Sequence, residues 1–175
     1  MKWIPRRYRK VALDIRTFGD PVLKTRAAPV ETFDESLVRL TEDMLATMRD
    51  NDGVGLAANQ VGRLKRVLVA SVEDEDYVVV NPVLTDRSTT TERGPEGCLS
   101  IPGIHVEVER PTAVTVSGQD ASGKPLRIEA SDMLARVLQH EVDHLDGVLI
   151  LDRTDRESRK AAMREWRERL LAQKG

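Results

Sequence analysis

The sequence contains only one cysteine, Cys98, in 175 residues. A single cysteine cannot form an internal disulfide bond, which excludes a disulfide-stapled scaffold and suits either a reducing compartment or a metal-ligand role. Aromatic residues make up 3% of the chain, so its core must be mainly aliphatic. No apolar run approaches the roughly 18 residues of a membrane-spanning helix. The net charge of −2 indicates no global attraction to membranes and no specific DNA binding.

The length predicts a single domain, residues 1–175, that is large enough to bury a core. Residues 1–10 carry basic side chains and no acidic ones, and they lack the apolar centre of a secretory signal. We therefore predict a flexible basic arm over residues 1–11, with an organelle transit remnant as the alternative. Residues 155–173 predict a C-terminal helix with this apolar face: Ala162, Met163, Trp166, Leu170 and Leu171.

Histidine is also scarce, and two of the three histidines are four residues apart in the segment His140-Glu141-Val142-Asp143-His144. Residues four apart lie on one face of a helix, with Cβ atoms about 5–6 Å apart. Two imidazoles at this spacing can bind one metal ion, and the glutamate between them can exchange protons with a metal-bound water. The segment therefore predicts a metal-binding helix. Ser131 or Asp132 can cap its start, and Gly147 can end it.

The helical wheel of this segment places Glu141 inside a wide apolar arc and the two histidines at one edge of that arc. Burying a carboxylate among apolar side chains is costly unless a partner such as a cation compensates. A raised proton affinity in such a setting is typical of a general base. The apolar arc consists of Met133, Leu134, Val137, Leu138, Val142 and Leu145, and the polar arc of Arg136, Gln139, Asp143 and Asp146.

Two histidines leave a catalytic metal site one protein ligand short. The third histidine of the extended two-histidine motif is absent, because Ile150 occupies its position. The remaining candidates are Cys98 and a downstream glutamate, such as Glu165. For Cys98 considered alone, a small buried hydrophobic residue is an equally good interpretation.

The glycine-rich segment 53–62 superficially resembles a dinucleotide-binding loop. Such a loop must follow a strand and open a helix, whereas here a predicted helix, opening at Asp34, precedes the segment. Its small residues more simply allow the backbone to pass close to a ligand or to another element.

Period-two alternation predicts five strands, which lie at residues 66–71, 77–81, 105–109, 113–117 and 126–129. Short connections between consecutive strands imply antiparallel pairing. The predicted fold class is α+β, with small antiparallel β-sheets packed around a central metal-binding α-helix and a C-terminal helix.

Three segments together resemble the peptide deformylase family. They are residues 53–60 (GVGLAANQ), 96–100 (EGCLS) and 139–145 (QHEVDHL). Their order and spacing fit the family, and residues 18–23 resemble its start, so that the resemblance extends over residues 12–155. Any one motif would be modest evidence, but three in register are specific. The basic N-terminal arm and the exact C-terminal sequence lie outside the pattern.

The resemblance implies that Cys98, His140 and His144 bind one divalent metal ion. That ion is natively iron(II), for which zinc, nickel or cobalt can substitute. The implied enzyme is a hydrolase of protein biosynthesis that removes the N-terminal formyl group from formyl-methionyl peptides and releases formate.

The family's mechanism implies that a metal-bound water attacks the formyl carbon while Glu141 acts first as general base and then as general acid. The side-chain amide of Gln60 and the backbone N–H of Leu99 would stabilise the oxyanion. The residues implied to bind the substrate are Val54, Gly55, Gly97, Met133 and Val137.

Other expectations concern the surroundings of this site. Arg136 occupies a position where we expect an apolar pocket wall. Glu96 is predicted to pair with Arg110 and so to brace the Cys98 loop. The charge of the C-terminal helix is compatible with contact to the ribosome, and the bacterial cytoplasm is the expected location, with an organelle as the alternative.

Two alternatives belong to other functional classes. A zinc endopeptidase would use both histidines and a glutamate such as Glu165, would cleave internal peptide bonds and would tolerate the loss of Cys98. A structural metal site would need four protein ligands, and no second cysteine is present to complete it.

Overall fold

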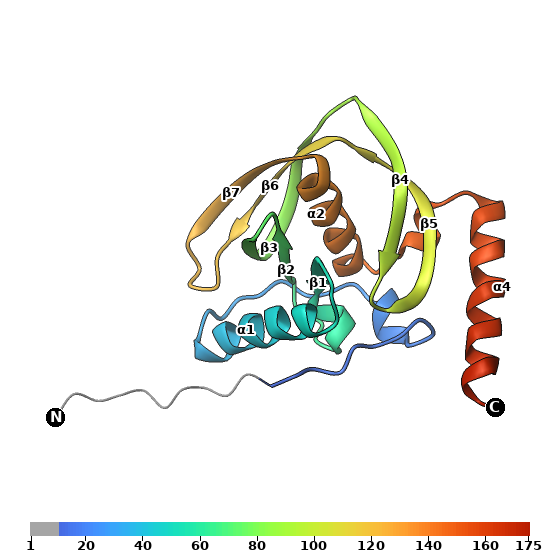
Figure 1. The fold of residues 1–175 in the computed structure, drawn as a ribbon. Helices are drawn as coiled ribbons and strands as arrows, with labels where there is room; N and C mark the ends of the chain where they lie inside the picture. Colours follow the sequence, from blue (N-terminus) through green and yellow to red (C-terminus); the bar gives the residue numbers. More distant parts are fainter. Residues whose placement is uncertain (1–10) are drawn as a thin grey trace.

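A central helix, α2 (Asp132–Leu145), lies between two antiparallel β-sheets in the computed structural model, which describes residues 11–175 (Figure 1). This arrangement confirms the predicted α+β class with a metal-motif helix at its centre. The predicted basic arm falls almost wholly on residues 1–10, outside the described residues. Within residues 11–175, no helix is long and apolar enough to cross a membrane.

The larger sheet has five strands in the order β1-β2-β3-β6-β7, and every neighbouring pair is antiparallel. Its strands are β1 (Gly55–Ala57), β2 (Val67–Val72), β3 (Glu75–Arg87), β6 (Ala113–Gln119) and β7 (Pro125–Ser131). Four of them overlap predicted strands: β2 has the predicted length and is shifted by one residue, and β3, β6 and β7 are longer than predicted. The shortest, β1, was not predicted as a strand.

The smaller sheet is a hairpin of β4 (Thr91–Cys98) and β5 (Ile101–Pro111). Along β5, buried and exposed residues alternate, as expected for a strand with one face against the core. Strand β4 was missed, because two glycines, a proline and charged residues hide its pattern. Strand β4 is recognisable only from its antiparallel pairing with β5. The register of this pairing shifts between Gly97 and Cys98.

Helix α1 (Glu35–Asp50) begins where predicted, because the side chain of Asp34 accepts a hydrogen bond from the backbone N–H of Leu37. Before α1, the chain forms a short 3-10 helix, η1 (Pro21–Lys24), which the Asp20 side chain caps. A second 3-10 helix, η2 (Ala58–Val61), follows β1 directly. The short helix α3 (Ile150–Arg153) leads into α4 (Arg156–Gln173).

Helix α2 starts and ends where predicted, but the capping hydrogen bond at its start is missing. Gly147 has a φ of +74° and donates its N–H to the carbonyl of His144, as glycine does after a helix C-terminus. Ser131 occupies the N-cap position, yet its side chain makes no capping hydrogen bond. On the sheet side, Leu138 and Leu145 are fully buried, and each stabilises the fold by about 1.5–3 kcal/mol relative to an exposed side chain.

Helix α4 docks on the outer side of the hairpin (Figure 1). Ala162 and Trp166 are buried against residues of β5 and α3, and Phe18 meets the Trp166 ring edge-on. The predicted apolar face is therefore correct in its first half. Leu170 and Leu171 are exposed, so the last turns do not contribute to the core.

Candidate active site

Cys98, His140 and His144 come together although they are far apart in the sequence. Their ligand atoms all lie within 4.8 Å of one another. The sulfur of Cys98 is 3.3 Å from Nε2 of His144, which is 3.1 Å from Nε2 of His140. Within residues 11–175 no other three side chains of these types meet this condition, and Glu165 pairs with Arg169 on α4 instead.

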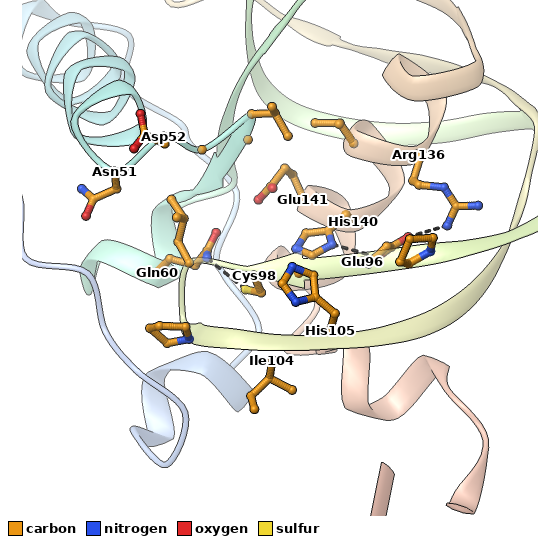
Figure 2. Close-up of a pocket in the computed structure, with 18 of the residues that line it drawn as sticks. Asn51, Asp52, Gln60, Glu96, Cys98, Ile104, His105, Arg136, His140 and Glu141 are labelled. Atoms are coloured by element: carbon orange, nitrogen blue, oxygen red, sulfur yellow. Dashed lines mark hydrogen bonds and ion pairs between the residues drawn. The ribbon is translucent and has the colours of Figure 1, made fainter. Parts of the chain in front are cut away.

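Two local features place these atoms. The histidines follow each other by one helical turn on α2, so both rings project from one face of the helix. Cys98 is the last residue of β4, at the tight turn into β5, and the shift in register there lets it pair with Ile101. The hairpin thus carries the sulfur to the helix that carries both imidazoles, and Figure 2 shows Cys98 beside His140.

Glu96 orients the His140 ring. Oε2 of Glu96 lies 2.9 Å from Nδ1 of His140, so Nδ1 donates to the carboxylate and Nε2 is the nitrogen that faces the cluster. Arg110 donates Nε–H and Nη2–H to the same carboxylate at 2.7 and 2.9 Å, which confirms the predicted pair. Burial alone would raise the pKa of Glu96, but the hydrogen bonds from Arg110 and His140 lower it well below its usual range.

Asp143 extends this ion-pair network and was not singled out from the sequence. Its Oδ2 accepts hydrogen bonds from Arg110 at 2.7 Å and from Arg153 at 3.0 Å. Asp143 is buried although the helical wheel placed it on the polar arc, because the part of that arc with Gln139 and Asp143 faces the hairpin, whereas Asp146 is exposed. The network therefore joins α2 to β4, β5 and α3.

Glu141 lies beside the cluster with an exposed fraction of only 4%. Its Oε2 atom is buried and has no hydrogen-bond partner among the described residues. Burial raises the pKa of Glu141 to about 7, although the charge of His140 opposes this rise. A carboxyl group of this kind can accept and return a proton near neutral pH.

Gly55 makes room for that carboxylate. A Cβ atom on Gly55 would lie 2.9 Å from both Cγ and Cδ of Glu141, closer than carbon atoms normally pack. The glycine is thus required by its close approach to the carboxylate and not by a left-handed backbone.

Gln60 reaches the cluster from η2, where it is almost fully buried. Its Oε1 accepts the N–H of Ala57 at 2.9 Å, which fixes the orientation of the amide. Its Nε2 lies 3.1 Å from Oγ of Ser100 and 3.5 Å from the sulfur of Cys98. The amide N–H groups therefore face the cluster.

One cavity of about 610 Å³ is lined by Gln60, Glu96, Cys98, His140 and Glu141. All the residues that the resemblance connected with the substrate lie on its wall, and Val54 and Met133 are exposed at its mouth. Sequence reasoning missed His105, which faces the cavity from β5 (Figure 2). The feature that could have identified His105 is its pairing across the hairpin. His105 lies directly opposite Gly97, and the absence of a side chain on Gly97 leaves room for the ring.

The chemistry of the cluster fits a divalent transition metal. One thiol and two imidazoles are ligands typical of zinc and similar ions, whereas magnesium and calcium prefer oxygen. The hydrogen bond between Nδ1 of His140 and Glu96 leaves Nε2 as the ring nitrogen that faces the other ligand atoms, as a metal ligand requires. Three protein ligands also leave a position open, which is typical of a catalytic site and not of a structural one.

Comparison with known proteins agrees with this geometry. The family model described as "Polypeptide deformylase" matches residues 12–160. The chain is 53% identical over 154 residues to peptide deformylase 1 of Corynebacterium efficiens, which covers 86% of this chain and 91% of that protein. It is 50% identical over 157 residues to peptide deformylase of a Parafrankia species, covering 89% and 85% of the two chains.

Solved structures give the same result. A peptide deformylase from Synechococcus elongatus in complex with actinonin superimposes with a TM-score of 0.84 and 42% identity, over 87% of this chain and 86% of the other. The peptide deformylase from Thermotoga maritima gives a TM-score of 0.81 and 47% identity, over 83% and 99%. By sequence and by structure, the chain belongs to the polypeptide deformylase family.

Proposed function

We propose that this deformylase removes the formyl group from the N-terminal methionine of formylated peptides by metal-assisted hydrolysis. The observation that carries this proposal is the cluster of Cys98, His140 and His144 beside the buried carboxyl group of Glu141, with Cys98, His140 and Glu141 on the wall of one cavity. Hydrolysis splits the formamide C–N bond with one water molecule and leaves formate and a free amine.

Cys98, His140 and His144 would hold the metal, and we propose iron(II) as the native ion, with zinc, nickel or cobalt able to replace it. When bound, such an ion supplies Lewis acidity that lowers the pKa of a water molecule and polarises the formyl oxygen. The thiolate of Cys98 is the ligand that would make the site sensitive to oxidation.

We assign the proton transfers to Glu141. Its buried carboxylate takes the proton from the attacking water and passes it to the departing amine nitrogen. A pKa raised to about 7 by burial supports both steps, since the group can then exist in either protonation state near neutral pH. Gly55 supports the same role by letting the carboxylate lie against the β1 backbone.

We assign the stabilisation of the oxyanion to the Gln60 amide and to the backbone N–H of Leu99. The hydrogen bond from Ala57 holds the Gln60 amide with its donor side toward Cys98 before any substrate arrives. A donor that is already oriented costs no reorganisation when charge develops on the formyl oxygen. Leu99 supports the assignment by its place directly after Cys98 on the cavity wall.

The methionine side chain would lie against Val54, Gly97, Met133 and Val137, all of which line the cavity. Strands β1 and β4 border the cavity with Gly55 and Gly97. An extended peptide can therefore add to these strands by backbone hydrogen bonds, because glycine leaves the backbone accessible.

The test is formate release from formyl-Met-Ala under anaerobic conditions with iron(II). We expect one formate for each formyl-Met-Ala consumed by the parent protein, and no acetate from the acetyl-Met-Ala control, whose acyl carbon carries a methyl group. A protein with full iron content that releases no formate would contradict the proposal. Cleavage of internal peptide bonds by the same preparation would favour the endopeptidase alternative.

We also propose that α4 contacts the ribosome. Ala162 and Trp166 dock the helix on the hairpin, which leaves the opposite face of α4 to solvent. Arg156, Lys160, Arg164 and Arg167 are exposed on that face and give it its basic character, whereas Arg169 lies against Gly103 of β5. Co-sedimentation with ribosomes should fall when Arg164 and Arg167 are changed to glutamate, and unchanged binding would contradict the contact.

The bacterial relatives support a place in the bacterial cytoplasm.

A further inference from the structure

Arg136 is a charged residue on the wall of the cavity, where an apolar side chain was expected. It lies on α2 one turn before His140, and its side chain is only 16% exposed. Figure 2 shows the guanidinium turned toward Glu96. The charge is therefore paired at the hairpin, and the residue needs an explanation other than contact with an apolar substrate.

The guanidinium group of Arg136 binds both strands of the hairpin. Its Nη1 donates to Oε1 of Glu96 at 2.9 Å and to the carbonyl of Val108 at 3.0 Å. Its Nη2 donates to the carbonyl of Glu92 at 2.8 Å. Because Glu92 is on β4 and Val108 is on β5, this one side chain fastens the helix to both strands.

Arg136 also completes the hydrogen bonding of Glu96. Each carboxylate oxygen has two acceptor positions. Oε1 accepts from Arg110 and Arg136, and Oε2 accepts from Arg110 and His140. The carboxylate that orients His140 is thus held from both sides, by one arginine from the hairpin and one from the helix.

We propose that Arg136 is a positioning residue that holds the β4–β5 hairpin, with Cys98 at its tip, against the helix that carries His140 and His144. The inference rests on the metal site of the proposed function, because the sulfur and the imidazoles belong to different elements. Their separation depends on how the hairpin sits on α2. A looser hairpin moves the sulfur away from the imidazoles without removing any ligand.

The need for arginine follows from its shape. A planar fork with five N–H donors can reach three acceptors at once, whereas the single ammonium group of lysine cannot match that geometry. Gly94 allows the close approach, since a Cβ atom there would lie 3.3 Å from Nη2 of Arg136. The methylene groups of Arg136 remain available as an apolar part of the cavity wall.

The test compares metal affinity in Arg136→Met, Arg136→Lys and a matched control, Arg66→Met. Arg66 is buried to a similar degree and also binds α2, through Asp146 at 3.0 Å and the Leu145 carbonyl at 3.1 Å, but it does not touch the hairpin carboxylate. Each apo-protein is titrated with Co²⁺, and the thiolate-to-cobalt absorption reports how well the sulfur binds. Circular dichroism and Tm establish that each variant is folded at the titration temperature.

We expect Arg136→Met to bind Co²⁺ about 10- to 100-fold more weakly, the usual effect of removing a group that orients metal ligands. Arg136→Lys should recover part of this loss, because it keeps one charged hydrogen bond to Glu96. Arg66→Met should lower Tm while leaving the Co²⁺ affinity within about 3-fold of the parent, because the contacts of Arg66 are with the end of α2 and not with Glu96 or the strands that carry Cys98. Unchanged affinity in Arg136→Met, or an equal loss in Arg66→Met, would overturn the proposal.

Gly94→Ala provides a second variant that keeps Arg136 itself. The added methyl group should displace the guanidinium and weaken Co²⁺ binding in the parent, but it should have no further effect in Arg136→Met. Additive losses would overturn the proposal. The titrations contain no substrate, so a parent protein that binds Co²⁺ but releases no formate would contradict the proposed function alone.

Discussion

Replacing Gly55 with alanine tests whether the exact place of the Glu141 carboxyl group matters for catalysis. The backbone of Gly55 is not left-handed, so alanine is compatible with it. The new Cβ atom, however, would stand 2.9 Å from Cγ and Cδ of Glu141. The substitution therefore acts on the proposed general base without changing a metal ligand.

The structure sets the size of the effect. Carbon atoms pack at about 3.5–4.0 Å, so the Glu141 side chain must retreat by about 0.6–1.1 Å. A displacement of about 1 Å in a catalytic group can lower the rate by up to about 10²-fold. The overpacking itself should destabilise the fold by about 1–3 kcal/mol.

The assay measures kcat and KM for formate release at full metal occupancy, together with Tm. For Gly55→Ala we expect kcat to fall about 10- to 100-fold while metal content stays at one ion per chain. Gly97→Ala is the matched control on the opposite wall, where the new methyl group meets the exposed and movable His105 ring, so KM should change more than kcat. An unchanged kcat in Gly55→Ala would refute the reasoning about Glu141.

Three further predictions concern single side chains. Glu141→Ala should keep its metal and lose turnover by about 10²–10⁴-fold, the usual contribution of a general base, and unaltered formate release would exclude the role. Cys98→Ser should weaken or alter metal binding, and full iron occupancy with full activity would count against ligation. Arg110→Ala leaves the buried carboxylates of Glu96 and Asp143 without their shared partner. We expect it to lower the free energy of unfolding by about 3–5 kcal/mol in urea titrations. Its metal affinity should fall as well, by about 10- to 100-fold. An unchanged affinity would show that Arg110 does not support the metal ligands.

The helix with the metal motif was predictable because its signals are local. The spacing of His140 and His144, the apolar arc and Gly147 all lie within one segment, and α2 has the expected extent and end. The Glu96–Arg110 pair was also correctly predicted, and it is confirmed by two hydrogen bonds. Period-two alternation correctly located strands such as β3 and β5, but the predicted strands were shorter than those in the structure.

The missed features depend on contacts between distant segments. Strand β4 carries glycine, proline and charged residues and becomes a strand only through its partner β5. The polar arc of α2 would face solvent on an ordinary surface helix. Here Gln139 and Asp143 are buried, because the hairpin covers that side of the helix and offers partners such as the Pro111 carbonyl and Arg110.

The role of Arg136 likewise depends on contacts between distant segments and could not be predicted from the sequence. Its helical position was correctly assigned to the polar arc, yet it also lines the cavity. A long side chain can have its methylene groups at an apolar wall and its charge at a distant carboxylate. Which carboxylate it reaches, and through which strands, follows only from the packing of the hairpin on α2.

The most direct test of the central claim is X-ray absorption spectroscopy of the zinc-substituted protein. We predict one sulfur neighbour at about 2.3 Å and two imidazole nitrogen neighbours at about 2.0–2.1 Å from a single ion. The sulfur neighbour should disappear in Cys98→Ser. A parent spectrum without sulfur, or one that Cys98→Ser leaves unchanged, would contradict a metal centre built from the β4–β5 hairpin and α2.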